Sequence, residues 1–170
     1  QNVRDNILKI FIYYSVLSII YLTLLNISGI RLFNSLNLSM TLVSGGGFLP
    51  SNNLSEIIST NLQKIVIILT LTLSMLNFYF LFNLFNKKTL FREHKEDFYL
   101  LAIAIVFVFL IYLYDLDGLN IIISIISSLS NSGISLIESD NNLSLYFLLI
   151  AIIGGSLVSN SSGIKLSRFY

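Results

Sequence analysis

Residues 32–53, LFNSLNLSMTLVSGGGFLPSNN, decide how this chain folds. The first half of this stretch is a short apolar run, and the second half changes to glycine, serine and asparagine. Residues 119–135, LNIIISIISSLSNSGIS, have the same order of apolar and polar halves. Each stretch therefore predicts a half-length hydrophobic helix that ends in flexible polar backbone.

The composition is that of a membrane protein. Only 11% of the 170 residues are charged and 55% are hydrophobic, whereas a soluble domain carries roughly a quarter charged residues. The formal net charge of +1 removes the attraction that dominates nucleic-acid binding. With no cysteine and one histidine, a zinc or thiolate site is also excluded. Because residue 1 is Gln rather than Met, we expect a fragment of a longer protein.

Four uncharged stretches are long and apolar enough for helices that cross a bilayer, which need roughly 17 to 25 residues. They are residues 10–30, 65–86, 98–114 and 143–164. Asn77 is expected in the middle of the second helix, in an interhelical hydrogen bond. The weaker stretches, 32–55 and 118–137, are expected to enter the membrane and return. We thus expect an all-α integral membrane protein with four transmembrane helices and two re-entrant loops.

The distribution of the basic residues favours this topology, because Lys and Arg in membrane proteins accumulate in the cytoplasmic loops. If all six stretches crossed the membrane, the ten basic residues would divide five against five. If only the four long stretches cross, eight share one face, and only Arg31 and Lys64 lie on the other. Both termini and the loop 87–97 are then cytoplasmic. The outer face would carry acidic residues that concentrate cations, namely Glu56, Asp115, Asp117, Glu138 and Asp140.

A shift of 86 residues reveals an internal repeat. It superimposes Lys9 on Lys95, Asn34 on Asn120, Ser44 on Ser130 and Gly47 on Gly133. These identities fall at the start of a long helix, at the start of a short helix and in the glycine turn. We predict a helix/loop/helix repeat over residues 1–86, a cytoplasmic linker over 87–97, and a second repeat over 98–170 that is truncated at its C-terminal end.

Non-helical backbone inside a membrane is unfavourable unless it has a function, because its N–H and C=O groups lack hydrogen-bond partners in the bilayer. The usual function is ion coordination, in which an extended strand directs carbonyl oxygens at a dehydrated cation. Glycine provides the backbone conformations that this requires, and Phe48 is expected to pack sideways and hold the strand. The alternative is that both polar clusters are only turns between hydrophobic segments.

Residues 32–53 and the following run IVIILTLTLSMLNFYFLF at 65–82 resemble the second repeat of the TrkH-type subunit of the Trk/Ktr/HKT potassium transporters. The part from Asn120 onward resembles the third repeat of that family. It ends in GGSLVSNSSGIK at 154–165, where the family has a loop of the form GGCAGSTGGGIK. The residues that keep the family's spacing are Gly154, Gly155, Ser159, Gly163, Ile164 and Lys165. The resemblance covers essentially the whole chain.

The resemblance implies that the chain is the middle half of a four-repeat protein whose loops surround one central pore for potassium uptake. The implied ion-filter residues, where potassium would bind, are Val43, Ser44, Gly45, Gly46, Gly47, Ser130, Asn131, Ser132 and Gly133. The implied gating loop beneath the filter consists of Gly154, Gly155, Ser159, Asn160, Ser161, Ser162 and Gly163. No cofactor is expected besides the transported ion.

The glycines of the implied gating loop also predict a break in the last helix. Each glycine costs about 1 kcal/mol of helix propensity relative to alanine. The hydroxyls of Ser159, Ser161 and Ser162 are then expected to face the pore. The alternative is a face of small residues that lets two helices pack closely. The sequence departs from the family pattern at positions that affect loop flexibility and filter packing, namely Ile134, Leu157, Val158, Ser161 and Ser162.

The resemblance also implies the partners of the chain. They are the lipid bilayer of a bacterial cytoplasmic membrane, the first and fourth repeats of the pore, a second copy in a homodimer, and a cytoplasmic nucleotide-binding regulatory subunit. We expect no nucleic-acid partner and no enzymatic activity. The alternative function is a non-conducting membrane scaffold, or a decayed remnant of such a transporter.

The topology is testable because the chain has no native cysteine. A cysteine that replaces Thr89 should lie in the cytoplasm, so an impermeant thiol reagent should label it only after the membrane is permeabilised. A cysteine that replaces Ser55, on the expected outer face, provides the opposite control. Labelling of Thr89→Cys from outside in intact cells would contradict the re-entrant topology.

Overall fold

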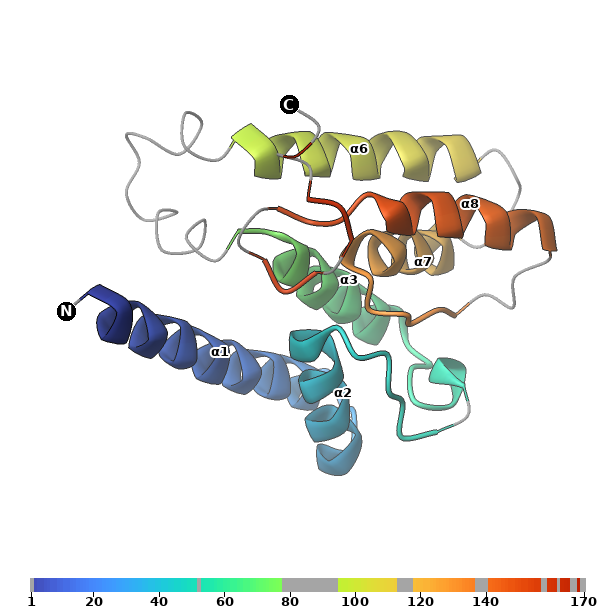
Figure 1. The fold of residues 1–170 in the computed structure, drawn as a ribbon. Helices are drawn as coiled ribbons and strands as arrows, with labels where there is room; N and C mark the ends of the chain where they lie inside the picture. The colour runs from blue at the N-terminus through green and yellow to red at the C-terminus, as the bar shows by residue number, and fades with distance from the viewer. Residues whose placement is uncertain are drawn as a thin grey trace.

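The computed structural model describes residues 2–51, 53–77, 95–112, 118–136, 141–156, 159–161, 163–165 and 168. Figure 1 shows the helices in chain order: α1 (Asn2–Ile27), α2 (Leu32–Ser44), the 3-10 turn η1 (Leu54–Glu56), α3 (Asn61–Met75), α6 (Lys95–Tyr112), α7 (Gly118–Ser130) and α8 (Asn141–Ile152). The residues described contain no β-strand, and one isolated parallel bridge joins Ile153 to Ile164. The predicted all-α class is confirmed over these residues.

Helix α1 exposes a large apolar surface. Its segment Ile10–Ile27 has a mean hydropathy of 1.9, yet only 22% of it is buried. Phe11 and Ile19 are 68% and 63% exposed. Within the described ranges, α1 is the one helix that is long and apolar enough to span a bilayer. Helices α3, α6 and α8 overlap the other three predicted spans, and their crossing of a membrane stays a prediction.

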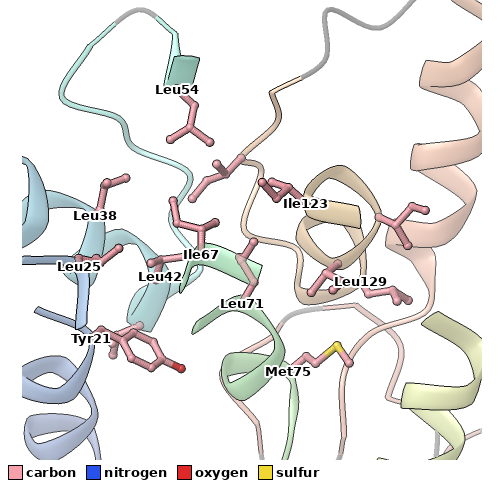
Figure 2. Packing of buried hydrophobic residues seen from close by; sticks show 14 of the residues in the cluster. Tyr21, Leu25, Leu38, Leu42, Leu54, Ile67, Leu71, Met75, Ile123 and Leu129 are labelled. Carbon is pink, nitrogen blue, oxygen red and sulfur yellow. The ribbon is translucent and has the colours of Figure 1, made fainter. Parts of the chain in front are cut away.

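Helix α3 lies between two groups of helices, the pair α1–α2 and the group α6, α7 and α8 (Figure 1). Its apolar side chains Ile67, Leu71 and Met75 are fully buried. They join one hydrophobic cluster with Leu42 of α2 and Leu129 of α7, as Figure 2 shows. Because α3 contributes to the core on both sides, it fixes the position of α7 relative to α2.

A capping box sets the start of α3. The Thr60 hydroxyl accepts a hydrogen bond from the backbone N–H of Gln63 at 3.4 Å, and the Gln63 side chain accepts from the backbone of Thr60 at 3.2 Å. These bonds satisfy N–H groups that have no partner inside the helix. The Gln63 amide also donates to the Ser28 carbonyl at 3.4 Å, which connects α3 to the turn after α1.

The end of α3 corrects one prediction. The helix stops at Met75, and Leu76 is extended with φ −80° and ψ 160°, so the prediction that Asn77 lies in mid-helix is wrong. The chain leaves the helix because other groups bind its backbone there. The Met75 carbonyl accepts from the Ser156 N–H at 3.1 Å, and the Asn77 N–H donates to the buried Asp97 carboxylate at 2.9 Å.

Some predictions concern residues outside those described. They include residues 78–86 of the second predicted span, residues 87–94 of the linker, and the acidic residues Asp115, Asp117, Glu138 and Asp140. Of the predicted linker, residues 95–97 are described, and they form the first turn of α6. The domain boundaries stay predictions.

The two short helices are equivalent. Helix α2 and helix α7 both have 13 residues, so the shift of 86 residues matches their first and their last residues alike. Helix α2 packs chiefly against α1, whereas α7 packs against α3, α8 and α6. The same local structure therefore forms twice in different surroundings, which indicates that the local sequence determines it.

Candidate functional site

A tight turn follows each short helix. In the first glycine turn (residues 45–48), Gly45 and Gly47 have left-handed φ values of 64° and 68°. In the second glycine turn (residues 131–134), Asn131 and Gly133 have φ values of 54° and 68°. The two left-handed positions are again 86 residues apart. Glycine adopts this conformation without steric cost, and asparagine tolerates it better than most residues do.

The same backbone hydrogen bond closes each turn. The Gly46 N–H donates to the Thr41 carbonyl at 3.2 Å, and the Ser132 N–H donates to the Ser127 carbonyl at 3.0 Å. Such a bond, which spans five residues, is typical of a helix that ends in a left-handed residue, and the Thr41 carbonyl also accepts from the Gly45 N–H. Each turn is therefore an ordered end of its helix.

Three predicted filter residues differ in local structure from the prediction. Val43 and Ser44 lie in the last turn of α2, and Ser130 is the last residue of α7. Non-helical backbone begins only after these residues, because the helical hydrogen bonding continues up to the left-handed residue.

The two glycine turns contact each other through their backbones. A Cβ atom on Gly47 would lie 2.9 Å from the Ser132 carbonyl oxygen and 3.7 Å from Cα of Gly133. A Cβ on Gly133 would lie 3.8 Å from Cα of Gly47. The approach is close enough that a side chain at position 47 would displace the second turn. The structure thus brings the two predicted filter glycines together.

The aromatic residue of the first turn lies beside it and is largely exposed. A Cβ on Gly46 would lie 3.3 Å from Cδ2 of the Phe48 ring, and Phe48 is 81% exposed. That the ring holds the turn stays a prediction. At the equivalent position, Ile134 is only 1% exposed and belongs to the hydrophobic core. Isoleucine, which replaces the aromatic residue of the family at position 134, is therefore well packed.

The predicted break in the last helix is confirmed. Helix α8 ends at Ile152, and the described residues of the loop 153–165 are not helical. Two backbone hydrogen bonds join the two ends of the loop. The Gly154 N–H donates to the Ile164 carbonyl at 2.9 Å, and the Ile164 N–H donates to the Ile152 carbonyl at 3.0 Å. Leu157, Val158 and Ser162 lie outside the described residues, and the gating role stays a prediction.

The hydroxyls of this loop form bonds within it. The Lys165 ammonium donates to the Ser161 carbonyl and, at 3.1 Å, to the Ser159 hydroxyl. The Ser161 hydroxyl accepts from the Gly155 N–H and is bonded to the Ser159 hydroxyl, both at 2.8 Å. The hydroxyls of Ser159 and Ser161 thus have partners within the loop, and that they face a pore stays a prediction.

The loop 153–165 lies against the beginning of both glycine turns. A Cβ on Gly45 would lie 3.7 Å from the Asn160 carbonyl oxygen. The Asn131 side chain donates to the Ala151 carbonyl at 3.0 Å, and its nitrogen would lie 3.0 Å from a Cβ on Gly163. Both polar atoms of the Asn160 side chain are buried without a hydrogen-bond partner. All three candidate segments therefore form one site.

These features define a class of helical protein in which two equivalent short helices direct their C-terminal ends to a shared backbone contact, next to a broken helix. No family model matches the chain. An uncharacterized cation transporter of Methanocaldococcus jannaschii, MJ1485, is 26% identical over 167 residues, which cover 96% of this chain and 34% of that protein. The potassium transporter TrkH from Vibrio parahaemolyticus has a crystal structure that is similar with a TM-score of 0.84 at 16% identity, over 98% of this chain and 39% of that one.

The chain thus has the fold of part of that transporter structure. It spans about a third of the length of the archaeal relative and about two fifths of the TrkH chain.

The contact between the turns predicts unequal effects of two alanine substitutions. Gly47→Ala strains a left-handed residue by about 1–3 kcal/mol and also presses Cβ against the Ser132 carbonyl. Gly133→Ala has the same φ but more space. In thermal unfolding of the purified protein, Gly47→Ala should lower the melting temperature most and Gly133→Ala less. Ser51→Ala, outside the turn, should leave it nearly unchanged. Equal shifts at positions 47 and 51 would contradict the contact.

Proposed function

We propose that this chain supplies two of the four filter loops of a pore that conducts potassium ions into the cell across a bacterial cytoplasmic membrane. The observation that carries the proposal is the backbone contact between Gly47 and Ser132, at the ends of two equivalent helices. A dehydrated cation needs closely spaced oxygen ligands in place of its water. Two turns of small residues in contact provide a high local density of backbone carbonyls.

The helices add an electrostatic contribution. Each helix carries a partial negative charge at its C-terminal end, where a cation is stabilised. Helices α2 and α7 both end at the glycine turns. The names of the archaeal relative and of TrkH, a cation transporter and a potassium transporter, support the same class of function. Potassium as the preferred ion rests on TrkH.

The loop 153–165 is proposed as the gate of this pore. It lies against Gly45 and Asn131, the first residues after the two short helices. The Lys165 ammonium holds the loop folded through Ser159 and Ser161. A folded loop at this position would obstruct the path of an ion that leaves the turns, so its displacement would open the pore.

The remaining parts of the proposal follow from this role. Four helices would cross the bilayer with both termini of the segment in the cytoplasm. The two turns described here cannot encircle an ion, so the first and fourth repeats of the complete protein would close the ring. A second copy of the protein and a cytoplasmic nucleotide-binding subunit would complete the assembly. No covalent chemistry is involved.

Uptake of potassium tests the function directly. The complete protein that contains this chain, expressed in a host that lacks its own potassium transport, should restore growth at low potassium and take up rubidium as a tracer. A protein that reaches the membrane in folded form and takes up neither ion would contradict the proposal and favour the non-conducting scaffold.

The gate makes a separate prediction. Deletion of residues 157–161 should raise cation flux, because it removes the obstruction together with the serines that Lys165 holds. Tracer flux per folded molecule in the membrane measures the effect, with the unmodified protein as reference. A deletion variant that folds and shows unchanged flux would show that the loop is not the gate.

A further inference from the structure

A side-chain hydroxyl ties each glycine turn back to its own helix. The Thr41 hydroxyl of α2 donates to the Phe48 carbonyl. The Ser127 hydroxyl of α7 accepts from the Ile134 N–H at 2.8 Å. Thr41 and Ser127 are 86 residues apart, and so are Phe48 and Ile134. The same pair of positions is therefore joined in both repeats, and we call these two contacts the hydroxyl tethers.

The tethers fasten the chain directly after the two filter glycines. Each one spans seven residues and encloses the whole glycine turn. Thr41 is 5% exposed and Ser127 is 2% exposed, so both hydroxyls are buried; the second bond is buried as a whole, and the first is partly buried. Backbone after the turn belongs to no helix or strand and needs partners of this kind.

The second tether also sets the direction of a filter carbonyl. In a trans peptide the N–H and the preceding carbonyl point in opposite directions. Since the Ile134 N–H points to Ser127, the Gly133 carbonyl points away from this part of α7. The first tether acts one peptide later, through the carbonyl of Phe48. The second tether thus restricts rotation of the peptide between Gly133 and Ile134, and the first restricts the peptide between Phe48 and Leu49.

Side-chain packing supports the two turns unequally. The Phe48 ring lies beside Gly46 but is 81% exposed, whereas Ile134 at the equivalent position is 1% exposed. In the second turn, Ser127 is held by a further bond of 2.9 Å to the buried Ser132 hydroxyl. The tether is therefore the common element of two turns that otherwise differ.

We propose that Thr41 and Ser127 are positioning residues for ion selectivity. Each holds the filter carbonyls at the spacing that distinguishes potassium from sodium, without touching the ion itself. This inference rests on the proposed function. A pore with a loosened turn would still conduct potassium, but its carbonyls would also adapt to the smaller sodium ion. We therefore expect the ratio of potassium to sodium uptake to fall more than the rate of potassium uptake.

The test compares isosteric and conservative variants of the complete protein. Thr41→Val and Ser127→Ala remove the tethers, whereas Thr41→Ser and Ser127→Thr retain a hydroxyl. The readout is the ratio of potassium to sodium uptake per folded molecule. Loss of one hydrogen bond should lower this ratio about fivefold, and the conservative variants should restore most of it.

Two buried serines on the same helices provide matched controls. Ser39 on α2 donates to the Leu36 carbonyl, and Ser124 on α7 donates to the Asn120 carbonyl, both within their helices. Ser39→Ala and Ser124→Ala should leave the ratio unchanged, since they remove buried hydroxyls that do not reach the turns. A general loss of stability would lower the amount of folded protein in all variants but not the ratio.

The outcomes separate the two proposals. If the unmodified protein takes up potassium and Thr41→Val and Ser127→Ala keep the ratio of the controls, the tethers do not position the filter. If the unmodified protein takes up no potassium, the proposed function itself fails, and the role in selectivity fails with it.

Discussion

The approach of Gly47 to the carbonyl of Ser132 is the constraint on which the rest of the site depends. Two backbone segments 86 residues apart come so near that a Cβ on Gly47 would lie 2.9 Å from that oxygen. Only glycine permits this approach at a left-handed φ of 68°. The contact fixes where α2 and α7 end relative to each other, and α3 supports it from the core with Ile67 and Leu71.

The two turns reach the same backbone shape by different means. The first has three consecutive glycines and leaves Phe48 exposed. The second replaces two of these glycines with Asn131 and Ser132, and it adds buried hydroxyl bonds and the core residue Ile134. The difference follows from the surroundings, because α7 is packed by three helices whereas α2 packs chiefly against α1. A buried turn needs partners for its polar groups.

The features that depend on local sequence could be predicted. The short helices, the glycine turns after them and the break before Gly154 follow from apolar runs that end in glycine and serine. The end of α3 at Met75 could not be predicted, because it depends on the distant Ser156 and Asp97. Thr41 and Ser127 could not be singled out for another reason. The shift of 86 residues aligns them, but a threonine and a serine are not identical, so a repeat defined by identities does not include them.

The sequence also leaves the direction of side chains open. Where the Phe48 ring lies, and which groups the Ser161 hydroxyl binds, depends on which segments lie nearby in space. Periodicity along the sequence contains no such information. The topology and the number of crossings rest on the distribution of charge and hydropathy, and α1 is the described helix whose length and hydropathy fit a crossing.

An experimental structure of the complete protein with rubidium, whose anomalous scattering locates the ion, tests most directly whether the two turns bind a cation. We expect a rubidium peak within about 3 Å of backbone carbonyls from both glycine turns, with Gly47 and Gly133 still in contact. Turns that contact each other with no ion beside them, or an ion held elsewhere in the protein, would contradict this expectation.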